Sequence, residues 1–163
     1  GSSFLGGFSA TLSEAATFTY ITTIGNFGKR SGGENGYSHS MVLDLQLTDR
    51  WNYVIQSDLV GYDDTTGFNG ITGNDQVGIN QYSFYTLSDC LAWGTRSEWW
   101  KTDGVSFYAQ TYGFNYKPHA NLTIRPEIRY DYTPTDSVRA TYLSQNGNEY
   151  DDLRFGIDAV LTF

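Results

Sequence analysis

Hydrophobic and polar residues alternate without a break over the last part of the chain, residues 151–163. From residue 153 onward, one parity carries the apolar side chains of Leu153, Phe155, Ile157, Ala159, Leu161 and Phe163. The other parity carries charged or small residues, among them Arg154, Gly156 and Asp158. A period of two residues predicts a β-strand with one apolar face. Chain termini usually fray, so alternation up to a terminal aromatic residue predicts that Phe163 is part of a sheet.

The same period recurs in earlier segments, and the sequence predicts eight strands in all. They cover residues 12–24, 37–48, 51–61, 76–87, 91–100, 105–116, 122–132 and 151–163. The segment 76–87 is ambiguous, because Val77, Ile79 and Tyr85 oppose Tyr82 and Phe84, so that either face could be the apolar one. No segment has a convincing helical period.

The connections between these strands alternate in length. Short turns are predicted at 49–50, 88–89 and 117–120, and longer polar or glycine-rich loops at 25–36, 62–74 and 133–150, with 102–104 as a short member of this second set. Short turns at one rim and long loops at the other are typical of an up-and-down antiparallel transmembrane β-barrel. The sequence thus predicts one all-β domain over residues 1–163, and an even strand number would place both termini at the short-turn rim.

Composition supports strands and excludes several other classes of protein. Hydrophobic residues make up 39% of the 163 residues, and no apolar run reaches the length of a transmembrane helix. Aromatic residues reach 17%, with 18 glycines, which strands and turns favour. The formal net charge of −8 argues against a nucleic-acid partner. The single Cys90 excludes an internal disulfide. No signal peptide begins at Gly1, as expected of a mature chain or a piece of a longer one.

The distribution of aromatic and charged residues favours a barrel with lipid outside. Aromatic residues gather near the strand ends, as in the two interfacial girdles of membrane barrels; the candidates are Trp51, Trp93, Trp99, Tyr130, Tyr132 and Phe163. Lysine is nearly absent from the strands, whereas a soluble barrel would cover its outer face with lysine and glutamate. A soluble lipocalin-like binder, with its apolar face inward, remains the alternative.

The polar parity carries arginines together with carboxylates, which predicts a charge network in the barrel interior. A buried arginine is costly unless a carboxylate accompanies it. The predicted network comprises Asp44, Asp58, Arg96, Glu98, Arg125, Glu127, Arg129, Asp131, Arg154 and Asp158. An eight-stranded barrel encloses little more than its own side chains. These residues would therefore fill the bore, and no large open pore is expected.

No other group of residues indicates chemistry. His39 and His119 lack a cysteine or second histidine at metal-ligand spacing and are interpreted as surface residues. Glu98 and Glu127 could form an acid–base pair, but salt bridges to arginine are the simpler interpretation. We expect no catalytic residue, no metal ion and no cofactor.

Three stretches of the sequence resemble the β-barrel porins of Gram-negative bacteria. They are residues 47–54, residues 93–100 followed by Asp103 and Gly104, and residues 112–118 continuing into 122–131. The resemblance implies an outer-membrane porin-like barrel, a non-enzymatic role in transport and contact with membrane lipid or detergent. A terminal strand ending in Phe163 is similar to the signal read by the outer-membrane assembly machinery.

The chain resembles the C-terminal part of longer members of that family. A truncated or engineered porin could instead be a non-conducting barrel that serves as a scaffold, and this alternative stays open. The solute and the oligomeric state are not predicted.

Overall fold

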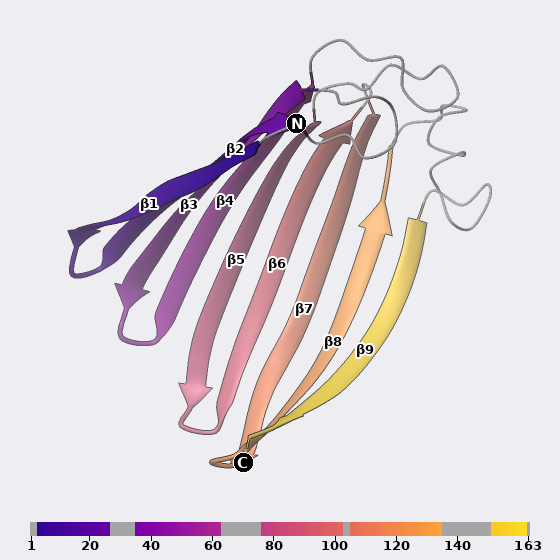
Figure 1. Ribbon diagram of the computed structural model, residues 1–163. Coiled ribbons are helices and arrows are strands. Elements are labelled where there is room, and N and C mark those ends of the chain that lie inside the picture. Colours follow the sequence, from indigo (N-terminus) through magenta and orange to yellow (C-terminus); the bar gives the residue numbers. More distant parts are fainter. Residues whose placement is uncertain (1–2, 27–34, 63–75, 103–104, 135–150, 163) are drawn as a thin grey trace.

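The computed structural model describes residues 3–26, 35–62, 76–102, 105–134 and 151–162, and in these residues the chain is a single antiparallel sheet (Figure 1). Its nine strands follow one another in chain order across the sheet. They are β1 (Ser3–Ser13), β2 (Ala16–Asn26), β3 (Asn35–Thr48), β4 (Trp51–Tyr62), β5 (Gln76–Ser88), β6 (Leu91–Thr102), β7 (Val105–His119), β8 (Leu122–Tyr132) and β9 (Asp151–Leu161). Within the described ranges, no helix is long and apolar enough to cross a membrane.

The prediction of eight strands is wrong at the N-terminus, where the structure has one strand more. The segment 12–24, interpreted as one strand, contains the turn Glu14–Ala15 that joins β1 to β2. β1 pairs with β2 from Ser3 opposite Gly25 to Ser13 opposite Ala16. Its alternation is weak because Gly6 dilutes the parity of Phe4 and Phe8, while Leu5 shares the other parity with Gly7 and Ser9.

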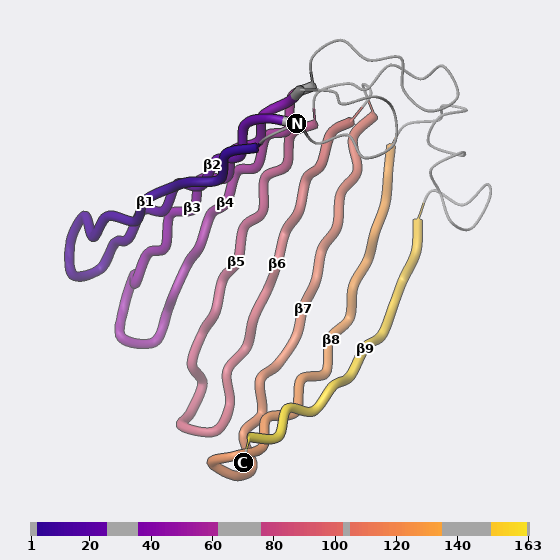
Figure 2. The backbone as a smooth tube through the Cα atoms, viewed as in Figure 1, coloured from indigo at the N-terminus to yellow at the C-terminus, as the bar shows by residue number. Residues whose placement is uncertain are grey.

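An odd number of strands places the two described ends of the sheet at opposite rims. Ser3 pairs with Gly25 at the long-loop end, whereas Leu161 pairs with Leu122 beside a short turn. Figure 2 shows the N and C ends at opposite ends of the strands. The expectation that both termini share the short-turn rim is therefore wrong.

Two of the predicted short turns lie slightly further along the chain. The turn expected at 88–89 lies at 89–90, and the one expected at 117–120 lies at 120–121. In the second case β7 continues through Pro118 to His119, with a register shift between Tyr116 and His119. Proline cannot donate to a strand ladder and is tolerated at such irregularities.

Pairing across the sheet separates an apolar face from a polar face, since residues directly opposite each other on neighbouring strands point to the same side. Ile79 lies opposite Trp99, which places Val77, Ile79 and Tyr85 of β5 on the apolar face. Tyr82 lies opposite Arg96, and Phe84 joins it on the polar face. The register thus settles the facing of the segment that sequence alone left ambiguous.

The sheet has almost no buried core of its own. Among the described residues the buried hydrophobic side chains are only Val105 and Ala109, which are 3% and 7% exposed. Large apolar side chains of β9 lie open instead, with Leu153 at 65% and Phe155 at 73%. Extended apolar surface of this kind marks a membrane or a protein contact.

The sheet curves across its strands (Figures 1 and 2). A hollow of about 540 Å³ is lined mainly by polar-face residues of β5 to β9, so the polar face is the concave one. The strand order runs from β1 to β9 without a pairing between these two outer strands. The sheet is therefore open at both edges within the described residues, and the closed barrel expected from the sequence is not seen.

Candidate functional site

Three strands of the polar face repeat one motif, an arginine whose partner carboxylate lies two residues away on the same strand. The pairs are Arg96 with Glu98 on β6, Arg129 with Asp131 on β8, and Arg154 with Asp152 on β9. Arg129 NH2 lies 2.8 Å from Asp131 Oδ1, and Arg96 Nε lies 3.1 Å from Glu98 Oε2. In every pair the carboxylate is the member nearer the long-loop end of its strand.

The register arranges these pairs into two parallel rows. One row, here called the basic row, runs Arg96, Thr111, Arg129, Arg154 from β6 to β9. The next row toward the long loops, here called the acidic row, runs Glu98, Ala109, Asp131, Asp152. Each row is a ladder of direct cross-strand partners, so charges of one sign follow one another around the concave face.

This arrangement is not the one that sheet stability alone would favour. Arg129 lies directly opposite Arg154, and Asp131 directly opposite Asp152. Like charges directly opposite each other are destabilising in a sheet. An exchange of Arg154 and Asp152 would turn both pairs into attractive ones. A functional role for the two charged rows therefore explains their arrangement better than sheet stability does.

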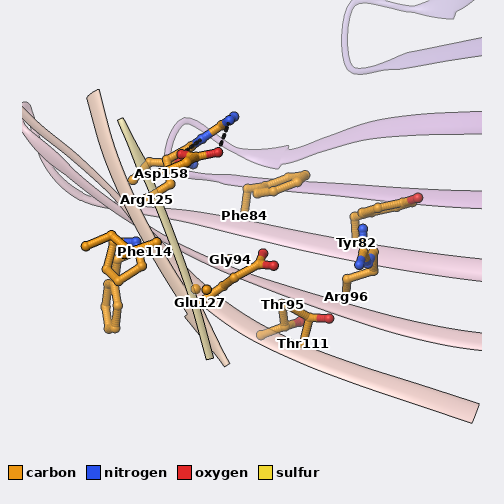
Figure 3. Close-up of a pocket in the computed structure, with 15 residues that line it drawn as sticks. Tyr82, Phe84, Gly94, Thr95, Arg96, Thr111, Phe114, Arg125, Glu127 and Asp158 are labelled. Atoms are coloured by element: carbon orange, nitrogen blue, oxygen red, sulfur yellow. Dashed lines mark hydrogen bonds and ion pairs between the residues drawn. The ribbon is translucent and has the colours of Figure 1, made fainter. Parts of the chain in front are cut away.

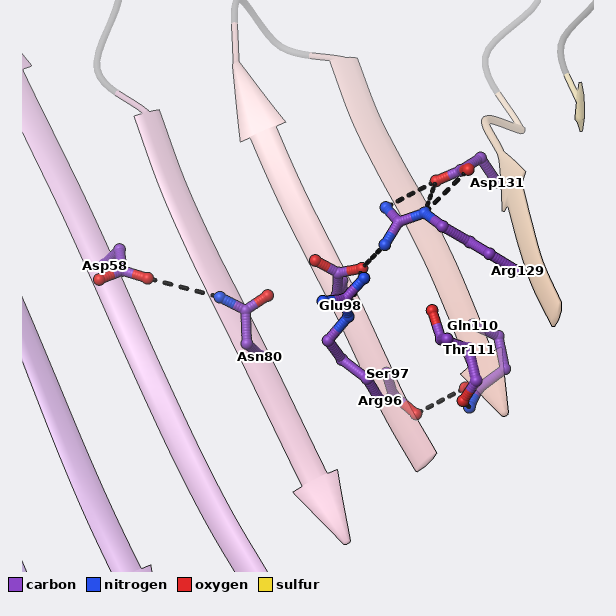
Figure 4. A network of polar contacts seen from close by, with 9 residues as sticks. All are labelled: Asp58, Asn80, Arg96, Ser97, Glu98, Gln110, Thr111, Arg129 and Asp131. Carbon is purple, nitrogen blue, oxygen red and sulfur yellow. Dashed lines mark hydrogen bonds and ion pairs between the residues drawn. The ribbon is translucent and has the colours of Figure 1, made fainter. Parts of the chain in front are cut away.

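Arg129 also joins the two rows across an intervening strand. Its NH1 group contacts Glu98 of β6, although β7 lies between their strands (Figure 4). The residue of β7 in the acidic row is Ala109, whose small, buried side chain leaves room for this crossing. Glu98 thus serves two arginines, Arg96 and Arg129.

Polar contacts continue on both sides of the two rows. Toward the short turns, Arg125 and Asp158 form a two-pronged ion pair, with Nε to Oδ1 at 2.7 Å and NH2 to Oδ2 at 2.6 Å. On β4, Asp58 accepts hydrogen bonds from Gln56 at 2.9 Å and, more weakly, from Asn80 at 3.4 Å.

Asp44 on β3 is also engaged, since it accepts a hydrogen bond of 2.6 Å from the amide of Asn52. It therefore has a hydrogen-bond partner on the polar face without an arginine beside it.

Three glycines, Gly94, Gly113 and Gly156, are among the residues that line the hollow in the concave face; Figure 3 labels Gly94 and Glu127 there. Gly94, Gly113, Glu127 and Gly156 are direct partners across β6 to β9, so a single side chain, that of Glu127, occupies this row. A Cβ atom on Gly156 would lie 3.4 Å from Glu127 Cγ, which shows that the glutamate side chain extends over the glycine.

Three polar groups of this hollow lack a hydrogen-bond partner within the described residues, and one of them, Arg96 Nε, has only its ion-pair contact with Glu98. The carboxylate of Glu127 has neither a hydrogen bond nor an ion pair there, and the hydroxyl of Thr111 is buried without a partner. Beside them, the rings of Tyr82 and Phe84 lie parallel with centroids 6.3 Å apart. The hollow thus offers polar groups and aromatic surface to a solute.

The ten residues of the predicted charge network all lie on the polar face. Three of its carboxylates, Asp44, Asp58 and Glu127, have no arginine in contact within the described residues, and of these three only Glu127 lacks a hydrogen bond as well. Sequence reasoning missed Asp152, the partner of Arg154, although it shares the polar parity with Arg154 and Asp158. It also missed Asn80 and Gln56, since amides carry no charge signal.

The predicted interfacial aromatics that the structure describes lie on the apolar face. Trp51 donates a hydrogen bond of 2.8 Å to Ser83, and Trp99 one of 3.2 Å to Ser106. Tyr130 stacks on Tyr132 with ring centroids 5.6 Å apart. Trp93 lies opposite Tyr85 near a short turn. Phe163 lies outside the described residues.

The two histidines lie on different strands, β3 and β7. The ring of His39 makes edge contacts of 6.1 Å with Tyr20 and Tyr37, and His119 ends β7. In the described ranges no group of three histidine, cysteine, aspartate or glutamate residues could hold a metal ion.

A curved sheet of consecutive antiparallel strands, with one apolar face and one charged concave face, defines the class of the porin-like β-barrel proteins. The family described as "Putative beta-barrel porin-2, OmpL-like" matches residues 1–163, and the chain belongs to this family. The resemblance seen in the sequence is thereby confirmed. No curated protein matches the sequence significantly.

Among solved structures, the chain is similar to a NanC porin determined in a rhombohedral crystal form. The TM-score is 0.61 at 13% sequence identity, and the match covers 99% of this chain and 78% of that chain. At this identity the likeness shows a shared fold, and it confirms the all-β, up-and-down porin architecture.

Proposed function

We propose that this chain forms much of the wall of a channel for small hydrophilic solutes in the outer membrane of Gram-negative bacteria. The polar face lines the water-filled lumen, and the apolar face contacts lipid. The observation that carries this proposal is the pair of charged rows on the concave face. Their like-charge neighbours cost stability in the sheet, whereas rings of one charge sign are how pores select ions.

Both edges of the sheet need partners in a membrane. The outward edges of β1 and β9 carry backbone groups without a neighbouring strand in the described residues. Lipid supplies no hydrogen bonds, so open sheet edges do not occur in the hydrocarbon region. We propose that these edges pair with further strands to close a barrel wider than nine strands alone would make. The fold match, which covers 78% of a porin chain, supports a wall of this extent.

The lumen in this proposal is open. The expectation of a plugged bore assumed eight strands, and that count is wrong. The ion pairs of the described residues follow the wall, within one strand or between β6, β8 and β9, and do not bridge the concavity. Arg96 and Arg129 consequently stay beside the wall and leave the bore to solute.

The charge of the polar face predicts a preference for cations. Its described strands carry five basic residues (Arg96, Lys117, Arg125, Arg129 and Arg154) and seven carboxylates (Asp44, Asp58, Glu98, Glu127, Asp131, Asp152 and Asp158), a difference of −2. Charges that line a low-dielectric opening raise the local concentration of the opposite ion.

Planar-bilayer recording tests this proposal. The refolded chain should give discrete current steps, and a potassium chloride gradient should give a reversal potential of the sign expected for cation preference. A well-folded, membrane-inserted chain without currents would contradict it and would favour the non-conducting scaffold. A chain that stays folded and monomeric in water without detergent would favour a soluble binder.

The remaining assignments follow from the same proposal. The channel has no enzymatic role, and its immediate surroundings are membrane lipid. We propose that the outer-membrane assembly machinery inserts it, as for other barrels of this kind.

A further inference from the structure

Near the middle of β4 to β7, six uncharged polar side chains interrupt the apolar face. They are Ser57, Gln81, Ser83, Thr95, Ser97 and Gln110, here called the outer polar patch. Gln81, Ser97 and Gln110 are direct partners across three strands, and Ser83 lies opposite Thr95 in the next row. These residues therefore form one continuous surface.

The outer polar patch lies near the middle of its strands, between two aromatic zones. Trp99 and Tyr108 lie on the long-loop side of it, and Trp51 and Trp93 on the short-turn side. This position corresponds to the hydrocarbon interior of a membrane rather than to its interfaces.

The patch is local to these strands. The row that contains Gln81 continues into Ile55 and Leu43 on one side. The row that contains Ser83 continues into Ile128 and Phe155 on the other. At the same level of the sheet, the neighbouring strands thus present apolar side chains as a lipid-facing surface should.

Contacts within the chain satisfy only part of the patch. The Tyr53 hydroxyl donates to Gln81 Oε1 at 2.7 Å, and the Ser97 hydroxyl donates to Gln110 Oε1 at 2.6 Å (Figure 4 shows the latter). The amide nitrogen of Gln81 has no acceptor among the described residues. That of Gln110 reaches only the Thr111 carbonyl at 3.4 Å, which is long for a hydrogen bond. Two donors thus point toward lipid, where no water is available.

We propose that a second copy of this chain covers the outer polar patch, in a side-by-side dimer within the membrane. The inference rests on the proposed membrane orientation. A carboxamide both donates and accepts hydrogen bonds, so Gln81 and Gln110 of one copy complement those of another related by a two-fold axis. Acyl chains offer no such partner, and the lack of charge in the patch disfavours a charged partner. Polar side chains mediate association between membrane segments in this way.

The first test replaces the two amides by apolar side chains of similar size, as Gln81→Leu with Gln110→Leu in the full chain. Energy transfer between labelled copies in phosphatidylcholine vesicles, measured against dilution in lipid, should show association at least tenfold weaker than in the unsubstituted chain. The matched control is Gln56→Leu on the polar face, which should leave association unchanged. Circular dichroism verifies that each variant keeps its sheet.

The second test locates the contact. In a Cys90→Ser background, Ser97→Cys should form a disulfide-linked dimer on oxidation in vesicles, whereas Leu43→Cys on the same face should not. A chain that remains monomeric at every protein-to-lipid ratio would overturn the proposal. Association that is unchanged by the Gln81→Leu and Gln110→Leu substitutions would overturn it as well. Channel currents and lipid contact at Ile128 are measured separately, so failure of the dimer is distinguishable from failure of the membrane orientation.

Discussion

Arg129 of β8 contacts Glu98 of β6 over the side chain of Ala109, the residue of β7 that lies between them. Two charged residues on strands that are not neighbours are thus joined because the intervening side chain is a single methyl group. The crossing links the basic row to the acidic row. It makes Ala109, a residue without chemistry of its own, a determinant of the charge arrangement.

Substitution of Ala109 by leucine should separate this pair. Ala109 is 7% exposed, so the larger side chain must displace the arginine or shift the strand. Overpacking of this kind costs about 1–3 kcal/mol. Urea titration of the refolded chain in detergent measures the loss. Ala92→Leu on the same face near a short turn is the control, and an equal loss in both variants would show that the crossing has no special role.

Replacement of Glu98 by glutamine should shift ion selectivity toward anions. Glu98 contacts both Arg96 and Arg129, and its neutralisation leaves these two arginines less compensated. The reversal potential in a salt gradient should move in the anion direction relative to the parent chain. Asp89→Asn in a short turn removes the same charge away from the concave face. A shift as large in that control would mean that overall charge, rather than the lumen row, sets selectivity.

Gly7 should tolerate alanine poorly although its neighbour Gly6 tolerates it. A Cβ atom on Gly7 would lie 2.2 Å from the carbonyl oxygen of Tyr20, a backbone atom that cannot rotate away. At Gly6 the obstacle is the ring of Phe4 at 2.5 Å, a side chain that can turn. We expect Gly7→Ala to cost about 1–3 kcal/mol and to speed amide hydrogen exchange in β1. Equal exchange rates in the two variants would contradict this packing.

Period-two alternation predicted most of the sheet because it reports directly which side chains share a face. Residues 122–132 were predicted with the bounds of β8, since Leu122 to Tyr132 alternate without exception. Periodicity did not predict strand β1, because Gly6, Gly7 and Ser9 are too small to mark which face of the strand is apolar. The predicted strand ended at residue 116, before the end of β7 at His119, because proline is common in turns. In the structure the strand accommodates Pro118 with a register shift.

The sequence predicts which residues lie on the polar face, but not which of them contact each other. Parity identified Arg129, Asp131 and Glu98 as neighbours of one face without indicating which would touch. The two rows arise from the register between strands, and the register depends on turns and bulges that single-strand periodicity does not contain. The crossing over Ala109 required the register of three strands at once. Closure of the barrel depends on the outer edges of β1 and β9, which alternation does not describe.

The central claim is that the polar face meets water and the apolar face meets lipid. Spin labels on single cysteines in a Cys90→Ser background test it most directly, with Leu43 and Ile128 on the apolar face and Gln56 and Asn115 on the polar face. In vesicles, labels at 43 and 128 should respond to oxygen dissolved in lipid, and labels at 56 and 115 to a water-soluble nickel complex. The reverse pattern, or equal access at all four positions, would contradict the assignment of the faces.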